Sequence, residues 1–189
     1  EKGLENLIKI VSDASLTGFY QKPRTDFAFM KQHAEGIIAL SACRSGEIPV
    51  ALEEGRWNDA VLLTYNYSRA FDEFYLEVEA SDTPEQLSLN KSIVALSETT
   101  GIPIVATNDS HYLTKDDAEI HEVLLAIQTN GKMSDPNRFK LDSDCYWFKS
   151  EEETRAYLAM SMKENDIDTA IANTLKIAEQ CNVELNLGT

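Results

Sequence analysis

The stretch from residue 102 to residue 112 limits the fold more than any other part of the sequence. Residues 102–106 (Ile-Pro-Ile-Val-Ala) are apolar and largely β-branched, and residues 107–111 (Thr-Asn-Asp-Ser-His) are polar. An apolar run of this length is typical of a strand buried on both faces, as in a parallel sheet covered by helices. Because binding and catalytic groups gather at the carboxyl ends of such strands, the stretch predicts an α/β fold with a functional site at residues 107–111.

Asp109 and His111 are candidate metal ligands at this strand end. A carboxylate oxygen and a neutral imidazole nitrogen both suit zinc, manganese or iron. A purely structural explanation is open as well, in which Asp109 caps the helix expected from about Thr114 and His111 stabilises the loop. Asn108 is a candidate for a supporting position, and His121 is either a second supporting residue or a surface residue.

A second buried strand is predicted at residues 37–41 (Ile-Ile-Ala-Leu-Ser), and Cys43 follows it closely. If this strand and residues 102–106 lie parallel in one sheet, Cys43 emerges at the same edge as Asp109 and His111. A metal ion would then stabilise the Cys43 thiolate as a third ligand. The alternative is an inert cysteine that packs among apolar side chains.

Residues 74–79 predict a third strand, because apolar side chains recur at every second position. Glu77 and Glu79 lie on the face opposite to these apolar side chains. If that face looks into a barrel, Glu77 lies near the polar site and supports it. If the strand is instead at the edge of the sheet, the two glutamates form a solvated face.

Helix start and stop signals divide the rest of the chain. A Thr-Pro-Glu-Gln sequence at residues 83–86 predicts a helix start, and Gly101 predicts its end. A capping box predicts a further start near Thr114, and Ser150 is predicted to cap another helix. Apolar periodicity and turn signals add helices at residues 4–14, 48–55, 58–71 and 168–181.

The charge of the chain limits its partners. With 17 Lys+Arg against 32 Asp+Glu, the formal net charge is −15, which opposes tight binding of a phosphate backbone. We therefore expect that the chain by itself does not bind DNA. The loop at residues 18–26 mixes aromatic and basic side chains, which fits either local phosphate binding or anchoring of the loop to the core.

The sequence also bears on location. No apolar stretch approaches the length of about 20 residues that crosses a membrane. Cys43, Cys145 and Cys181 are odd in number and widely spaced, which argues against a disulfide framework. We therefore expect a cytoplasmic protein without a membrane segment.

The alternation of strands and helices predicts a (β/α) barrel, but three strands are evident where a closed barrel needs about seven or eight. We expect an incomplete barrel at residues 1–132, whose first half precedes this chain. Residues 133–189 lack the alternation. They are expected to form a mostly helical C-terminal extension with one aromatic strand at residues 141–149.

Six short segments carry a more specific signal. They are residues 6–12 (Asn-Leu-Ile-Lys-Ile-Val-Ser), 18–24 (Gly-Phe-Tyr-Gln-Lys-Pro-Arg), 39–43 (Ala-Leu-Ser-Ala-Cys), 74–77 (Phe-Tyr-Leu-Glu), 105–112 (Val-Ala-Thr-Asn-Asp-Ser-His-Tyr) and 127–129 (Ile-Gln-Thr). Taken together, these segments resemble the alpha subunits of bacterial DNA polymerase III, a family of replicative polymerases. The likeness covers essentially the whole chain and places residues 1–132 in the later part of the PHP (polymerase and histidinol phosphatase) domain. Residues 148–185 resemble the segment that leads to the polymerase palm.

The resemblance implies a PHP-type (β/α)7 barrel with a multinuclear centre of divalent metal, zinc or manganese. Cys43, Asp109 and His111 match the last three ligands of the family's set. The earlier ligands, a His-x-His motif followed by Asp, His, Glu and His, are expected before Glu1. The catalytic aspartates of the palm, which work with magnesium, are expected outside this chain as well.

Three functions are compatible with this pattern. The first is a fragment of a replicative polymerase that acts on DNA and deoxynucleotides with other replicase subunits, and whose PHP domain is a phosphoesterase or 3′–5′ exonuclease. The second is a non-catalytic PHP module that docks partner proteins. The third is a free-standing PHP-like metal-dependent phosphoesterase. For the first, we expect the isolated chain to be inactive, because most metal ligands and the palm would be missing.

Overall fold

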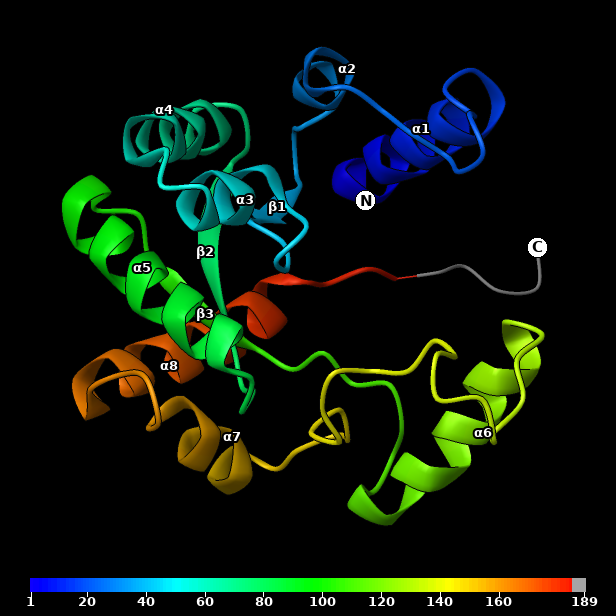
Figure 1. The fold of residues 1–189 in the computed structure, drawn as a ribbon. Helices are drawn as coiled ribbons and strands as arrows, with labels where there is room; N and C mark the ends of the chain where they lie inside the picture. Colours follow the sequence, from blue (N-terminus) through cyan, green and yellow to red (C-terminus); the bar gives the residue numbers. More distant parts are fainter. Residues whose placement is uncertain (185–189) are drawn as a thin grey trace.

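Three parallel strands form the centre of the fold (Figure 1). They are β1 (Ile38–Leu40), β2 (Glu73–Glu79) and β3 (Ile104–Thr107), in the order β1-β2-β3. The computed structural model describes residues 1–184. The strands predicted at residues 37–41, 74–79 and 102–106 are confirmed. Because β2 pairs with β1 on one side and with β3 on the other, it is the central strand of the sheet.

Helices connect and cover these strands, which confirms the predicted α/β class. Within residues 1–184 no further strand joins the sheet, so the described part of the chain forms an open sheet and not a closed barrel. The helices are α1 (Lys2–Leu16), α2 (Phe27–Gln32), α3 (Glu47–Glu53), α4 (Trp57–Ser68), α5 (Pro84–Thr100), the 3-10 turn η1 (Lys115–Asp117), α6 (Ala118–Gln128), α7 (Glu151–Leu158) and α8 (Glu164–Gln180).

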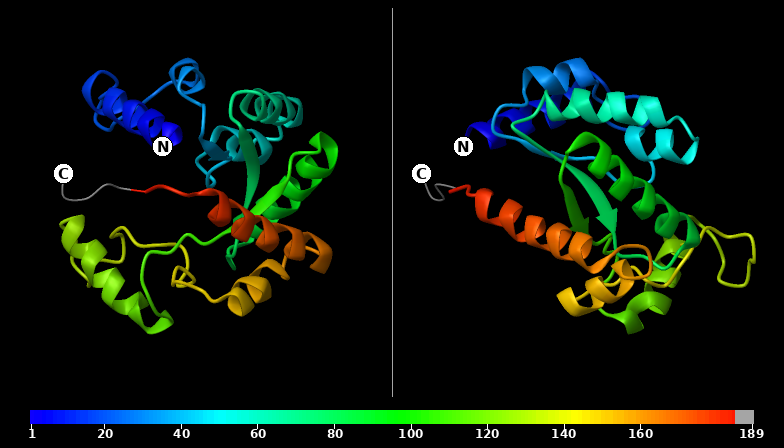
Figure 2. Two further views of the ribbon diagram at one scale, coloured as in Figure 1. Left: turned by 180° about the vertical axis from the view of Figure 1, so that it is seen from behind. Right: turned by 90° about the vertical axis from the view of Figure 1, so that its left-hand side faces the viewer.

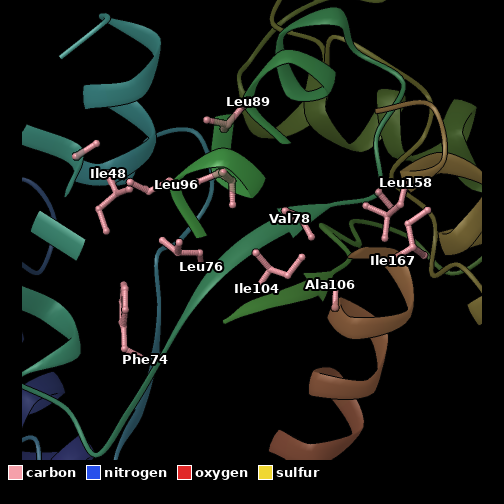
Figure 3. Close-up of a cluster of buried hydrophobic side chains, with 14 of the residues drawn as sticks. Ile48, Phe74, Leu76, Val78, Leu89, Leu96, Ile104, Ala106, Leu158 and Ile167 are labelled. Carbon is pink, nitrogen blue, oxygen red and sulfur yellow. The ribbon is translucent and has the colours of Figure 1, made fainter. Parts of the chain in front are cut away.

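One face of the sheet is buried against helices. Phe74, Leu76 and Val78 point to this face, because every second side chain of a strand lies on the same side. Figure 3 shows them in one apolar cluster with Leu89 and Leu96 of α5. Since this cluster fixes the orientation of β2, the glutamates of the strand must face the opposite side.

Helix α8 packs along β3, on the side away from β2 (Figure 2). The side-chain amide of Asn173 donates to the backbone carbonyl of Ile104 at 2.8 Å. The hydroxyl of Thr174 donates to the carbonyl of Ala106 at 2.7 Å. A helix thus satisfies backbone acceptors that a neighbouring strand would otherwise take, and it covers this edge of the sheet.

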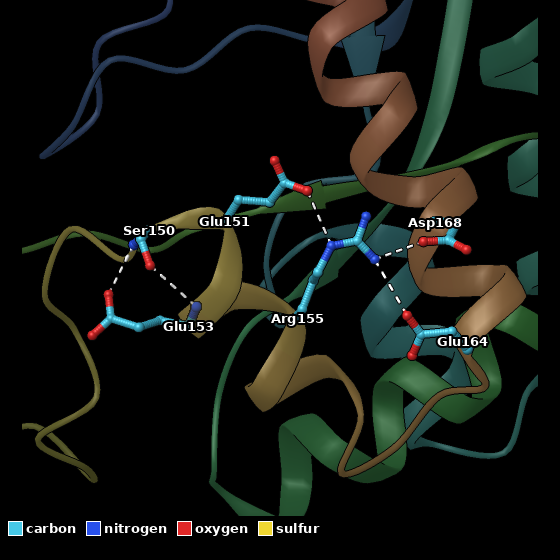
Figure 4. A network of polar contacts seen from close by, with 6 residues as sticks. All are labelled: Ser150, Glu151, Glu153, Arg155, Glu164 and Asp168. Atoms are coloured by element: carbon cyan, nitrogen blue, oxygen red, sulfur yellow. Dashed lines mark hydrogen bonds and ion pairs between the residues drawn. The ribbon is translucent and has the colours of Figure 1, made fainter.

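Arg155 ties α7 to α8 (Figure 4). Its guanidinium pairs with Glu151 on its own helix at 3.0 Å, and with Glu164 and Asp168 on α8 at 3.4 Å and 2.6 Å. All four side chains are at least partly exposed. Since solvent screens such pairs, the network orients the two helices more than it stabilises the fold.

Four of the predicted helix caps are confirmed, one of them the capping box of Thr114 and Asp117 before η1. The side chain of Thr83 accepts a hydrogen bond from the N–H of Gln86 at the start of α5. Gly101 follows α5 with a φ of 73°, a left-handed conformation that favours glycine. Ser150 caps α7 as predicted, and it forms a capping box with Glu153 (Figure 4).

Residues 141–149 do not form the predicted strand. They make a single parallel bridge, between Trp147 and Tyr112. The reason is local: the hydroxyl of Ser143 accepts the backbone N–H of Cys145 at 3.0 Å, and such side-chain bonds compete with a strand ladder. The segment nevertheless lies beside the residues that follow β3.

Helices α1 and α6 stand apart from the sheet (Figure 1). On α6, Ile120, Leu124 and Ile127 are 61%, 57% and 71% exposed and form an apolar stripe. On α1, Ile8 and Val11 are each 56% exposed. Neither these helices nor any other within residues 1–184 combine the length and the apolar character needed to cross a membrane.

Candidate metal centre

The carboxyl ends of all three strands converge on one small pocket. Its volume is about 130 Å³, and both Cys43, which follows β1, and Asp109, which follows β3, line its wall. Glu79, the last residue of β2, lies between them in the order of the sheet. Cys43 is exposed and not buried among apolar side chains, so the inert-core alternative does not hold. Also in the lining are Arg44, Ala80, Ser81, Thr83, Gln86, Asp142, Cys145 and Tyr146.

Asp109 and His111 are bonded to each other. The Nε2 atom of His111 lies 3.1 Å from Oδ1 of Asp109, and both side chains are solvent-accessible. With Nε2 engaged by the carboxylate, Nδ1 is the ring nitrogen left to accept another partner. Asp109 does not cap the helix that follows, because Thr114 and Asp117 form the capping box there. The purely structural explanation for Asp109 is therefore excluded.

Two more aromatic contacts surround this pair. The ring of His121, on α6, lies edge-on to the ring of His111, with the centroids 5.6 Å apart. The ring of Tyr146 approaches His111 from another direction at 5.1 Å. His121 is therefore a neighbour of His111, and its supporting role in the site stays a prediction.

Glu77 and Glu79 of β2 lie in surroundings that disfavour their charged forms. Burial, together with the nearby charges of Glu77 and Asp109, raises the pKa of Glu79 to about 7, while Arg44 opposes the shift. Burial also raises the pKa of Glu77, although the hydroxyl of Thr107 donates to its carboxylate at 2.7 Å. Because β2 is the central strand, the edge-strand explanation for these glutamates is excluded.

The donor atoms of these residues suit a divalent cation, but they lie too far apart in this structure to bind one ion together. A thiol, a carboxylate and an imidazole are suitable ligands for zinc, and a cation would relieve the repulsion among the buried carboxylates. Among residues 1–184, however, no three His, Cys, Asp or Glu side chains stand close enough together to share one ion. The assignment of Cys43, Asp109 and His111 as metal ligands therefore stays a prediction.

Asn108 points away from the pocket. Its amide nitrogen donates to the hydroxyl of Thr154 on α7 at 3.2 Å, and its Oδ1 atom is buried without a hydrogen-bond partner among the described residues. It lines a separate groove between β3, α7 and α8. A supporting role in the metal site also stays a prediction.

Sequence reasoning missed the contribution of residues 141–149 to the pocket. Cys145 and Tyr146 line it, and Cys145 is buried, with its sulfur 3.7 Å from the hydroxyl oxygen of Ser81. The signal was present in the aromatic run Tyr-Trp-Phe at residues 146–148. Its long separation from β3 in sequence gave no reason to place it at the site.

The loop at residues 18–26 is not anchored by its aromatic side chains. Phe19 and Tyr20 are 60% and 66% exposed. The guanidinium of Arg24 lies 5.2 Å from the ring centroid of Tyr20. The anchoring alternative is thereby excluded, and phosphate binding by this loop stays a prediction.

Comparison with known proteins extends these observations. Residues 1–81 match the model of the PHP domain. The DNA polymerase III subunit alpha of Thermus aquaticus is 39% identical over 187 residues, which cover 98% of this chain and 15% of that protein. The subunit of Deinococcus radiodurans is 40% identical over 189 residues (99% and 14%), and that of Borreliella burgdorferi 36% over 183 residues (96% and 15%).

Along nearly its whole length, the chain is similar to DNA polymerase III alpha subunits. It spans about one seventh of the length of the alpha subunits that it matches. The PHP match contains β1, β2 and Cys43, whereas Asp109 and His111 follow it. The likeness to the alpha subunits continues past the PHP match and includes the whole candidate site.

Proposed function

We propose that this chain is part of a bacterial replicative DNA polymerase, whose activity is DNA-directed DNA synthesis. The observation that carries the proposal is the likeness to polymerase alpha subunits along 98% and 99% of the chain. DNA, deoxynucleotides and other replicase subunits would be partners of the whole protein, which would use magnesium in its palm and work in the cytoplasm.

We further propose that the sheet belongs to a PHP-type (β/α)7 barrel at residues 1–132, followed by an extension at residues 133–189. Support comes from the PHP match and from the strand order β1-β2-β3. Sequential parallel strands with helices between them are the repeating unit of such barrels. The two glutamates of β2 would then face the barrel interior, and in the closed barrel a strand would replace α8 beside β3.

Within that barrel, Cys43, Asp109 and His111 would hold a zinc or manganese ion. Three features support this assignment: the shared pocket of Cys43 and Asp109, the Asp109–His111 bond, and the accumulation of carboxylates at the strand ends. A bound ion would supply a nucleophilic hydroxide and neutralise charge on a phosphodiester, as a phosphoesterase or 3′–5′ exonuclease requires. Asp109 would orient the imidazole of His111, and Cys43 would bring a soft thiolate from the end of β1, on the other side of β2.

A non-catalytic docking module is the second candidate. The apolar stripe of Ile120, Leu124 and Ile127 on α6 favours it, because exposed apolar patches commonly mark contact surfaces. A free-standing hydrolase gains no support, since the relatives named above are all polymerase subunits.

Two assays on the complete gene product test the proposal. Primer extension on a primed DNA template must be observed, and its absence from a folded, pure protein would overturn the polymerase assignment. Release of nucleotides from a 3′ end of DNA then distinguishes a catalytic PHP site from a non-catalytic docking module. A catalytic site loses this activity in Cys43→Ser and keeps it in Cys181→Ser, a matched control at another exposed cysteine. A docking module shows no such difference.

A further inference from the structure

The segment formed by residues 141–149 is fastened across the site at two points. At one, the hydroxyl of Ser143 donates to the carboxylate of Asp82, just beyond β2, at 2.6 Å. At the other, Tyr112 holds the segment: its hydroxyl donates to the carbonyl of Asp144 at 2.6 Å, and its own carbonyl accepts the N–H of Phe148 at 3.0 Å. The segment thus spans the space between the ends of two neighbouring strands.

Tyr146 lies at the middle of this segment and contacts His111 in two ways. Its carbonyl accepts the backbone N–H of His111 at 2.7 Å. Its ring lies edge-on to the imidazole, with the centroids 5.1 Å apart and an interplanar angle of 65°. The hydroxyl of Tyr146 donates in turn to the carboxylate of Asp142, which fixes the direction of the ring.

These contacts confine the imidazole from several sides. Asp109 holds Nε2, and the rings of His121 and Tyr146 pack edge-on against the imidazole at 5.6 Å and 5.1 Å. Asp109 alone would leave the exposed ring free to turn, because one hydrogen bond to a partly exposed carboxylate does not select one side-chain rotamer. An aromatic ring at edge-on distance does restrict it.

We propose that Tyr146 is a positioning residue that holds the His111 imidazole in the orientation needed for metal binding. The inference rests on the proposed metal site, which it deepens: the geometry of one ligand is set by a residue that lies beyond the PHP match. Partners that orient a ligand commonly change metal affinity by about 10- to 100-fold when removed.

Three variants of the 189-residue chain separate the side chain from the backbone. Tyr146→Ala removes the ring but keeps the carbonyl that bonds to His111. Tyr146→Phe keeps the ring and loses only the bond to Asp142. Tyr20→Ala removes an exposed tyrosine far from the site in sequence and serves as the control.

The first readout is metal-free and reports on positioning directly. NMR spectra of the His111 ring should show one ring-current-shifted environment in the parent chain, Tyr146→Phe and Tyr20→Ala. Tyr146→Ala should show a shift toward the values of a rotationally averaged histidine. An unchanged His111 ring in a folded Tyr146→Ala variant would overturn the inference. If Tyr146→Ala does not fold, nuclear Overhauser contacts between the rings of Tyr146 and His111 in the parent chain provide the test. Their absence would also overturn the inference.

The second readout uses the complete gene product, in which the proposed barrel would be whole, and measures the dissociation constant for Co²⁺ by its thiolate charge-transfer absorption. We expect Tyr146→Ala to weaken binding about tenfold and Tyr146→Phe to keep the affinity of the parent protein. Equal binding by the parent protein and His111→Ala would refute the proposed metal site, while the ring spectra would still decide whether Tyr146 positions His111. Equal binding by the parent protein and Tyr146→Ala, with binding by His111→Ala impaired, would refute the positioning role alone.

Discussion

Asn173 on α8 donates its side-chain amide to the backbone carbonyl of Ile104 on β3, at 2.8 Å. The next residue, Thr174, repeats the contact at Ala106. A helix therefore takes the place beside β3 that a strand would occupy in a larger sheet. This arrangement protects an otherwise open edge, which would be prone to pairing with other chains.

The edge contact predicts a measurable loss of stability in Thr174→Val. Valine keeps the β-branched shape but leaves the carbonyl of Ala106 without its donor, which should cost about 1 to 2 kcal/mol in the free energy of unfolding. Thr169→Val in the same helix removes an exposed bond to Asn165 and should change stability by less than about 0.5 kcal/mol. Urea denaturation measures both, and equal effects would contradict the role of α8 at the edge.

Glu79 predicts a pH-dependent stability. Its pKa in the folded chain is raised to about 7 from an ordinary value of 4.5, so the folded state binds its proton more tightly than the unfolded state. The resulting stabilisation is complete below the unfolded value and disappears as the pH rises through about 7. As the pH rises from 4.5 to 8, the free energy of unfolding of Glu79→Gln should therefore increase by roughly 2 to 3 kcal/mol relative to that of the parent chain.

Denaturation curves across this pH range test the Glu79 prediction. The matched control is Glu98→Gln, at an exposed position of α5. If the free energies of unfolding of Glu79→Gln and the parent chain differ by the same amount at all pH values, the pKa of Glu79 is not raised by folding, and the prediction is wrong.

The core of the sheet predicts a large effect for Leu76→Ala. Leu76 is fully buried in the cluster between β2 and the helices, and truncation of such a side chain costs about 3 to 5 kcal/mol through lost contacts and the cavity left behind. Leu62→Ala, at a leucine that is 61% exposed, should cost far less. Thermal unfolding of both variants provides the comparison.

The net charge of −15 predicts that the 189-residue chain does not bind primer-template DNA appreciably at physiological salt. Fluorescence anisotropy with labelled DNA measures this. A submicromolar dissociation constant that weakens with added salt would contradict the prediction and point to the exposed loop at residues 18–26.

The sequence allowed the scaffold of the site to be predicted, because each step depends on local pattern. The apolar run at residues 102–106 and the alternation at residues 74–79 identified two strands, and parallel pairing then places Cys43 and Asp109 at one edge. The burial of Glu77 was ambiguous, since alternation alone does not distinguish a central strand from an edge strand.

What could not be predicted depends on contacts distant in sequence. The placement of Tyr146 beside His111 results from the bonds that Tyr112 and Asp82 make to residues 141–149, and no periodic pattern encodes such bonds. Likewise, the cover of β3 by α8 depends on two polar side chains, Asn173 and Thr174, in a helix whose sequence shows no special feature.

The metal content of the complete gene product, measured by inductively coupled plasma mass spectrometry after dialysis, tests the central claim most directly. We predict bound zinc or manganese in the parent protein and in Asp116→Asn, a control at an exposed carboxylate of η1. We predict a marked loss of that metal in Asp109→Asn. Equal metal content in Asp109→Asn and Asp116→Asn would contradict the assignment of Cys43, Asp109 and His111 as a metal centre.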